Sequence, residues 1–471
     1  MTRNLLSLLL GASALTACAA GPDYRPLALP KTAPAPFTGA TYPQVSTAAA
    51  QDRWWTLYGD PLLDQLVADA LAANTDIRVA VARIDRARAS LRGARSERLP
   101  QTDLSASQTY TRTSAVRSLP GLDRENWVSD GVLDLSYEVD LFGRVKRGIE
   151  AARGDVAAAQ ADADGVRVAV IADTVRAYLD VTATAERLAV AQRTVGLLDQ
   201  SVRITGARVD AGRSDRLDLI RTTSLREQQQ AAIPALAADR DAALFRLATL
   251  TGRAPQQLPE AVRTATRTPQ LSQPIPVGDG QALLARRPDI RAAERRLAAD
   301  TARIGVATAD LYPRITLGAS VGTTAVGGGE LLGGGPLNWV LGPLISWAFP
   351  NQEAIRARIG AAKADSAASL ATFDGAVLLA LEETERALSA YAHAIERART
   401  LTAARDEAAR AARISLARQR EGRIDFLTVL DAQRTLASAE ADLATATRAL
   451  SFAQVDLFRA LGGGWGTPRQ D

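Results

Sequence analysis

Residues 132–144 read Val-Leu-Asp-Leu-Ser-Tyr-Glu-Val-Asp-Leu-Phe-Gly-Arg. Apolar side chains take alternate positions and polar side chains the positions between them: Leu133, Leu135, Tyr137 and Val139 against Asp134, Ser136, Glu138 and Asp140. A period of two predicts a β-strand with one apolar and one polar face. Such alternation over about ten residues fits a sheet that faces lipid on one side and water on the other.

The same alternation recurs in three further stretches. Their apolar positions are Leu104, Ala106 and Tyr110, then Ile315, Leu317, Ala319 and Val321, then Trp339, Leu341, Ile345 and Trp347. We therefore predict two β-hairpins, at residues 101–141 and 314–349, with exposed loops at 112–126 and 324–336. Pro343 interrupts the last run, because proline has no amide hydrogen to donate to a neighbouring strand.

The two hairpins belong to two copies of one unit. Identical residues between Asp76 and Ser107 recur without a gap at a shift of 213, so that Pro100 falls on Pro313; a later block recurs at a shift of 210, so that Gly212 falls on Gly422. We predict an internal tandem repeat of about 210 residues. Each copy, 60–252 and 286–462, is read as a helix, two strands, a long helix, a turn and another long helix.

Long proline-free stretches follow each hairpin. No proline occurs between Pro120 and Pro234 or between Pro350 and Pro468. Apolar residues recur there every seven positions, which is typical of packed helices: Leu188, Val195 and Val202, and Leu381, Leu388 and Ile395. If residues 352–419 form one helix, it is about 100 Å long. The predicted fold class is mixed α and transmembrane β, mostly α.

Four strands cannot form a membrane barrel alone. An unpaired backbone group in lipid costs several kcal/mol, so a sheet there cannot keep open edges. The smallest known barrels have about eight strands, so copies of the chain must share one barrel. Two copies would supply eight strands and three would supply twelve, and the strand pattern does not choose between them. A soluble hairpin that packs on the helices is the alternative.

The N-terminus predicts secretion and lipid attachment. Arg3 and the apolar run Leu5 to Leu15 indicate a signal peptide at residues 1–17, because the run is too short to span a bilayer. The run ends in Leu-Thr-Ala-Cys18, which resembles the lipobox of bacterial lipoproteins. As the only cysteine, Cys18 cannot form an internal disulfide, but it could carry a diacylglycerol thioether and an N-acyl chain. The next residue is Ala19 and not the aspartate that usually retains lipoproteins in the inner membrane. We therefore expect export to the outer membrane, where two or more acyl chains would give a stable anchor. An ordinary signal with an incidental cysteine is the alternative.

Several function classes lack support. The net charge of +4 is dispersed along helices, which disfavours a nucleic-acid surface. His393 is the sole histidine and lies in a helical heptad region, so a surface or seam role is favoured over catalysis. No metal-ligand spacing, nucleophile elbow or phosphate loop occurs. We therefore expect no enzyme activity, no metal and no cofactor beyond the covalent lipid.

Several motifs together resemble the TolC-type outer-membrane efflux proteins, most closely the lipoprotein branch typified by OprM and NodT. These motifs are residues 18–26, 54–61, 74–83, 137–144, 286–290, 422–433 and 461–465. The resemblance implies a homotrimer with a twelve-stranded outer-membrane β-barrel, four strands per chain, continued by a twelve-helix periplasmic α-barrel. It also implies an equatorial mixed region that includes the lipid anchor and Pro-rich segment 18–59, the linker 253–285 and the tail 463–471.

The resemblance further implies the exit duct of a tripartite efflux system for small molecules such as drugs. Its partners would be a periplasmic adaptor (membrane-fusion) protein and an inner-membrane pump, commonly of the RND class. The duct would be a passive conduit. A duct for type I protein secretion or for metal efflux is the nearest alternative. A structural coiled-coil lipoprotein that spans the envelope is an alternative of another class, although it leaves the strands unexplained.

The resemblance also places a gate at the periplasmic tip, where the long helices turn. Gly212 and Gly422 mark the turns, because glycine tolerates the backbone that ends a helix. Leu427 and Asp431 are four residues apart, share one helix face and match the family's constriction. Three Asp431 carboxylates in a ring would repel one another unless cations or basic residues relieved the charge.

The residues that would lock this gate depart in part from the family pattern. Asp218 matches an acidic residue that helps to lock the tip in relatives. The arginine and tyrosine that complete the lock in some relatives fall on Ile424 and Gln419, and Arg423 or Arg221 could substitute. The alternative is that Asp431 and Asp218 are ordinary charged surface residues.

Overall fold

The computed structural model describes residues 19–26, 37–117, 121, 123–271, 273–327 and 337–464. Cys18 and the signal peptide lie outside the described residues. The chain divides into two compact units. The sheet unit contains Arg83–Gln160, Ala292–Asp374 and the described residues 19–26; the helical unit contains Ala161–Arg291, Gly375–Asp471 and the described residues 37–82.

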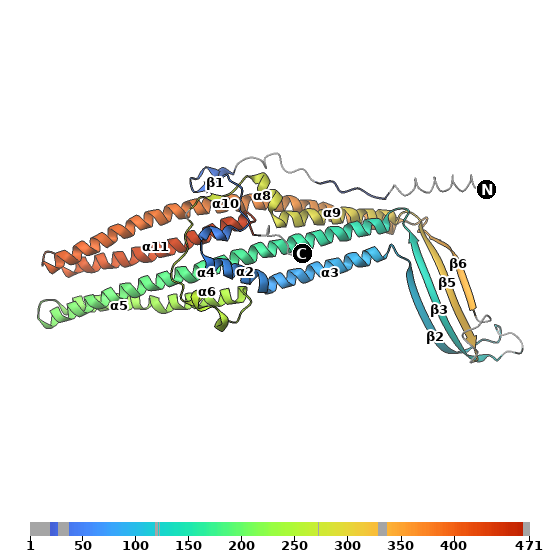
Figure 1. Ribbon diagram of the computed structural model, residues 1–471, viewed down its shortest axis with the longest axis horizontal. Coiled ribbons are helices and arrows are strands. Elements are labelled where there is room, and N and C mark those ends of the chain that lie inside the picture. Colours follow the sequence, from blue (N-terminus) through green and yellow to red (C-terminus); the bar gives the residue numbers. More distant parts are fainter. Residues whose placement is uncertain are drawn as a thin grey trace. The chain divides into compact units, whose positions relative to one another are not determined.

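The sheet unit holds one antiparallel four-stranded sheet in the order β2-β3-β5-β6 (Figure 1). Its strands are β2 (Gln101–Arg112), β3 (Glu125–Val139), β5 (Arg314–Val326) and β6 (Leu337–Ser346). The four predicted strands are confirmed. The interruption expected at Pro343 is wrong: β6 continues through it and pairs Pro343 with Leu317. Because β6 pairs with only one described strand, a missing amide hydrogen can face its open edge.

The register separates the two faces of the sheet. Leu104, Leu133, Val321 and Trp339 are successive cross-strand partners and form one apolar row. The neighbouring row consists of Asp103, Asp134, Ser320 and Val340. Because successive side chains of a strand point to opposite faces, these two rows lie on opposite sides of the sheet.

Four helices contribute to the sheet unit: α3 (Thr75–Ser96), α4 (Arg144–Asp210), α9 (Pro288–Ala309) and α10 (Glu353–Arg420). Leu91 of α3 packs with Val145 and Ile149 of α4. A Cβ added at Gly154 of α4 would lie 2.9 Å from the Ala299 Cβ of α9, so these two helices approach closely. The single helix predicted over residues 352–419 is confirmed by α10, whose 68 residues span about 100 Å.

The helical unit completes the long helical hairpins with α5 (Arg216–Gln230), α6 (Ala232–Leu250) and α11 (Phe426–Ala460). The single long helix expected after Gly212 is wrong, because it breaks at Ala231 into α5 and α6. Pro234 explains the break, since it has no N–H for the carbonyl four residues earlier. The corresponding helix α11 has no proline and is continuous.

A second break was not predicted. The helix expected from Pro61 to before Pro100 consists of α2 (Pro61–Ala73) and α3, separated by Asn74. The Asn74 Oδ1 accepts hydrogen bonds from the backbone N–H groups of Asp76 at 2.8 Å and Ile77 at 3.3 Å. Its Nδ2 donates to the Leu250 carbonyl at 3.0 Å, so the buried Asn74 ends one helix and caps the next.

The core of the helical unit is built around Trp54, which stacks on Phe458 with ring centroids 4.5 Å apart. Short elements surround this core: η1 (Thr38–Thr41), η2 (Trp54–Tyr58), η3 (Pro255–Gln257), α7 (Glu260–Arg263) and α8 (Gly280–Arg286). The strands β1 (Val45–Ser46) and β4 (Ile275–Pro276) pair in parallel. This pairing joins parts of the two segments, 18–59 and 253–285, that were assigned to the equatorial region.

Candidate functional site

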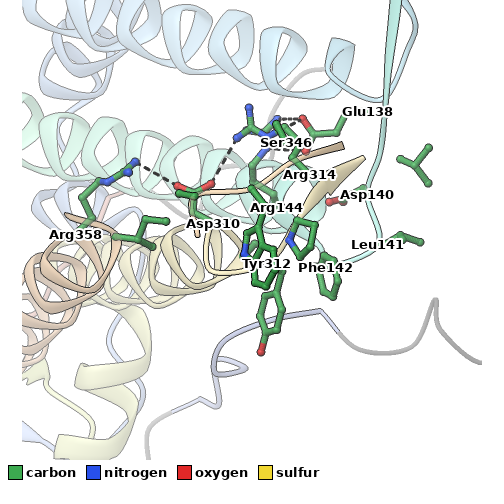
Figure 2. A pocket seen from close by; sticks show the side chains of 16 residues that line it. Glu138, Asp140, Leu141, Phe142, Arg144, Asp310, Tyr312, Arg314, Ser346 and Arg358 are labelled. Carbon is green, nitrogen blue, oxygen red and sulfur yellow. Dashed lines mark hydrogen bonds and ion pairs between the residues drawn. The ribbon is translucent and has the colours of Figure 1, made fainter. Parts of the chain in front are cut away.

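A charged cluster lies in the sheet unit where the strands end and the long helices begin (Figure 2). Arg144, the first residue of α4, donates from Nε and Nη2 to the two carboxylate oxygens of Glu138, both at 2.8 Å. It also reaches Glu97 at 2.9 Å. The hydrogen bond to Glu138 raises the pKa of Arg144, which keeps its charge. This bidentate ion pair joins the end of β3 to the start of α4.

Asp310 forms the second half of the cluster and lies between two arginines in Figure 2. Its carboxylate is 3.5 Å from Arg314 of β5 and 3.4 Å from Arg358 of α10. The surrounding side chains line a cavity of about 440 Å³. The end of α9 is thereby tied to both a strand and a long helix.

Aromatic rings and a helix cap complete the junction. Phe142 stacks on Tyr312 with centroids 4.5 Å apart, and Trp347 stacks on Phe349 at 4.7 Å. The Asp140 carboxylate accepts from the backbone N–H groups of Val145 at 3.1 Å and Lys146 at 2.8 Å, and so caps α4. These roles were not predicted, because Glu138 and Asp140 also fit the polar face of the strand pattern.

Gly212 and Gly422 end α4 and α10 in the left-handed conformation, with φ of +68° and +72°. In each turn the N–H of the following arginine donates to a carbonyl five residues earlier, at 2.7 Å for Arg213 and 2.9 Å for Arg423. This Schellman motif requires the positive φ that glycine supplies. Asp215 and Asp425 then cap α5 and α11. Hydrogen bonds from Thr428, first from its side chain, hold the pKa of Asp425 below its ordinary value.

Three of the predicted gate residues line one cavity of about 550 Å³ in the helical unit. Arg221 comes from α5, and Leu427 and Asp431 come from α11. The remaining lining residues were not predicted: Ile220, Ser224, Leu225, Gln228, Leu430 and Arg434. Arg434 could have been found from the sequence, because it follows Asp431 by three residues and therefore shares its helix face.

The other two predicted gate residues do not line this cavity. Asp218 lies at the start of α5 and accepts from the Ser214 hydroxyl at 3.5 Å. The Arg423 Nε is 3.1 Å from the Glu421 carboxylate, and both side chains are exposed. Within the single chain the structure therefore groups Arg221, but not Arg423, with Asp431.

The part of the chain that the structure describes offers no group of three His, Cys, Asp or Glu side chains that could hold a metal ion. His393 is exposed on α10 and lies 3.7 Å from Glu396.

The profile of the outer membrane efflux protein family matches residues 66–253 and 280–463. The chain belongs to the outer membrane efflux protein family. This efflux protein is 31% identical to nodulation protein T of Rhizobium leguminosarum bv. trifolii over 451 residues, which cover 96% of this chain and 95% of that relative. It is 32% identical to outer membrane protein OprJ of Pseudomonas aeruginosa over 465 residues, which cover 98% of this chain and 96% of that relative.

Structural comparison agrees with the sequence. The efflux protein matches the outer-membrane channel OprN with a TM-score of 0.87 and 38% identity, over 95% of this chain and 100% of that one. Members of the family are channels, not enzymes. The chain is accordingly a channel component of an outer-membrane efflux system.

Proposed function

We propose that three copies of this efflux protein form one exit duct, in which their sheets close a twelve-stranded barrel in the outer membrane. The observation that carries the proposal is the apolar row across the sheet. Leu104, Leu133, Val321 and Trp339 are 78%, 45%, 49% and 70% exposed in the single chain. A soluble protein rarely exposes a continuous apolar surface of this kind, whereas lipid would cover it.

The sheet edges supply the reason for assembly. Among the described strands β2 and β6 each pair with one neighbour only. Contact of β6 in one copy with β2 in the next, repeated around an axis, would close the ring and pair the free backbone groups. Twelve strands instead of eight follow from the resemblance to TolC-type proteins. The tandem repeat that the sequence predicts is supported by α3 and α9, which start 213 residues apart at Thr75 and Pro288.

The long helices support the same assembly. An 18-residue window of α10 has a mean hydropathy of 1.3, and only 17% of it is buried within the chain. By length and composition alone such a window could cross a membrane. We assign it to contacts with a neighbouring copy, because α10 as a whole is about 100 Å long and a bilayer core is only about 30 Å thick. Side-by-side packing would give the twelve-helix periplasmic α-barrel.

The duct would be anchored by lipid at Cys18 and would work with a periplasmic adaptor protein and an inner-membrane pump of the RND class. Family members serve tripartite drug efflux systems, which favours small molecules over secreted proteins or metal ions as cargo. Transport energy comes from the pump, and the duct supplies a conduit and a gate. We place the gate at Asp431 and Leu427, with Arg221 as the partner of Asp431 and with Asp218, Arg423 and the Gly212 and Gly422 turns beside it.

The subunit count of the detergent-solubilised particle tests the proposal directly. Native mass spectrometry should give three copies of the processed chain, whose precursor mass is 49.8 kDa. Two copies would support an eight-stranded barrel, and a single water-soluble copy would refute the duct. Conductance in planar bilayers separates the duct from a structural envelope lipoprotein, which would form no channel.

A further inference from the structure

The residues that follow Cys18 lie against a surface of the sheet unit, termed the groove, that includes Phe142, Arg147, Glu294 and Gly305. The Ala20 N–H donates to the Phe142 carbonyl at 2.9 Å, just beyond the end of β3. Farther along, the Tyr24 hydroxyl donates to Glu294 of α9 at 2.9 Å. Hydrogen bonds therefore hold residues 20–24 at both ends.

Arg147 of α4 binds the middle of this segment. Its Nε donates to the Ala20 carbonyl at 3.2 Å, and its Nη2 donates to the Gly21 carbonyl at 3.5 Å and to Asp23 at 2.6 Å. Glu150 accepts from the remaining nitrogen at 2.8 Å. The Arg147 side chain is only 4% exposed, and burial of a guanidinium is costly unless its donors are paired. The hydrogen bond from Arg147 lowers the pKa of Asp23, as expected for a carboxylate that is paired with a guanidinium.

Glycines leave the space that the segment fills. A Cβ added at Gly305 of α9 would lie 2.8 Å from both the Ala20 carbonyl oxygen and the Arg147 Cγ. A Cβ added at Gly143 would lie 2.7 Å from the Ala19 Cβ. Real Cβ atoms do not approach other atoms this closely, so side chains at these two positions would displace residues 19–21.

We infer that this groove is a receptor for the mature N-terminus, which holds the lipid-bearing residue beside the ends of the barrel strands. This role rests on the proposed lipidation of Cys18, which directly precedes Ala19 in the sequence. The described residue Ala19 lies against Gly143, which follows Phe142 of the Phe142–Tyr312 stack, and aromatic rings of this kind mark the membrane interface of barrels. Arg147 is a positioning residue that sets the anchor and the barrel at one membrane depth.

A nitroxide spin label at Arg25→Cys tests the groove in the full-length, membrane-extracted protein. Position 25 is exposed, and a lipidated Cys18 has no free thiol, so the chain without Arg25→Cys should take up no label. We expect an immobilised spectrum for Arg25→Cys alone. The spectrum should become predominantly mobile when Arg147→Ala or Gly305→Val is added.

Two further variants test whether a mobile label reports loss of the groove or only a less stable fold. Gly305→Ala adds a methyl against Ala20 yet favours the helix by about 0.5–1 kcal/mol, so a mobile label there reports a blocked groove. Arg303→Ala is the matched control, because Arg303 of α9 pairs with Asp155 and Asp300 and has no described contact with residues 19–26. Its label should stay immobile. A mobile label in Arg25→Cys alone would refute the receptor role. A label that stays immobile when Arg147→Ala is added and also when Gly305→Val is added would refute it as well.

Fatty-acid labelling separates the groove from the lipid. Tritiated palmitate should label the parent, Arg147→Ala and Gly305→Val equally, because the leader directs lipidation, and Cys18→Ser should abolish the label. Labelling that persists in Cys18→Ser overturns the lipid-positioning role. Neither result alters the subunit count or the conductance, on which the duct itself depends.

Discussion

The two faces of β3 allow a sharp test, because the neighbouring residues Leu133 and Asp134 point to opposite sides of the sheet. We predict that Leu133→Arg prevents assembly in the membrane, whereas Asp134→Arg is tolerated. Both variants add the same side chain at almost the same depth. Only the face that meets lipid can distinguish them.

The expected free-energy cost of Leu133→Arg follows from the position of Leu133 near the middle of the 15-residue β3. An arginine on the lipid face costs about 2–4 kcal/mol at the bilayer midplane, so three copies in one ring cost about 6–12 kcal/mol. Asp134 lies directly opposite Asp103 in the register, and like charges in such a pair repel. Asp134→Arg replaces this repulsion with attraction, so its net cost should be near zero or favourable.

The assay is recovery of the heat-modifiable oligomer from outer-membrane fractions, with total expression measured in parallel. Leu133→Arg should reduce the recovered oligomer at least tenfold relative to Asp134→Arg. On a soluble sheet both arginines would face water and behave alike. Equal recovery of the two variants would therefore refute the lipid-facing assignment of the apolar row.

Three further predictions concern the gate, the lumen and the helical unit. Asp431→Ala should increase single-channel conductance and admit large antibiotics into cells, and unchanged conductance would remove Asp431 from the gate. Three aspartates share the polar face of the sheet, Asp103, Asp130 and Asp134, and their replacement by asparagine should lower the ratio of cation to anion permeability. An unchanged ratio would place ion selectivity elsewhere. Arg287→Ala should lower the thermal midpoint more than Arg287→Lys, because the 9% exposed Arg287 side chain bridges Asp289 and Glu383 and donates to the Ala460 carbonyl. We expect a loss of about 2 kcal/mol, and equal midpoints for the two variants would contradict it.

The strands and the longest helices could be predicted because their signals are local. Alternation with a period of two marks all four strands. The absence of proline after Pro350, together with the turn expected at Gly422, gives α10 within one residue of its observed start and end. Both patterns arise from the geometry of a single element and need no knowledge of its neighbours.

The unpredicted features depend on contacts between distant residues. Asn74 ends α2 partly because its side chain binds the Leu250 carbonyl, which is 176 positions away in the sequence. Glu138 continues the strand alternation, yet it meets Arg144 and thereby joins a strand to a helix. A periodic pattern assigns a residue to a face but does not identify the partner that it meets there, so these roles required the folded chain.

The composition of the cavity around Asp431 bears on how a gate there could close. Each chain contributes Arg221 and Arg434 beside a single Asp431, and none of these three forms an ion pair with another described residue of its own chain. In a ring of three, each aspartate could therefore find a guanidinium from its own or a neighbouring copy, because the arginines outnumber the aspartates two to one. Repulsion among the Asp431 carboxylates can then be relieved by the protein alone, without a bound cation. Such a lock would open when a partner protein separates the α5 and α11 helices, because that movement breaks the pairs and leaves the aspartates facing one another.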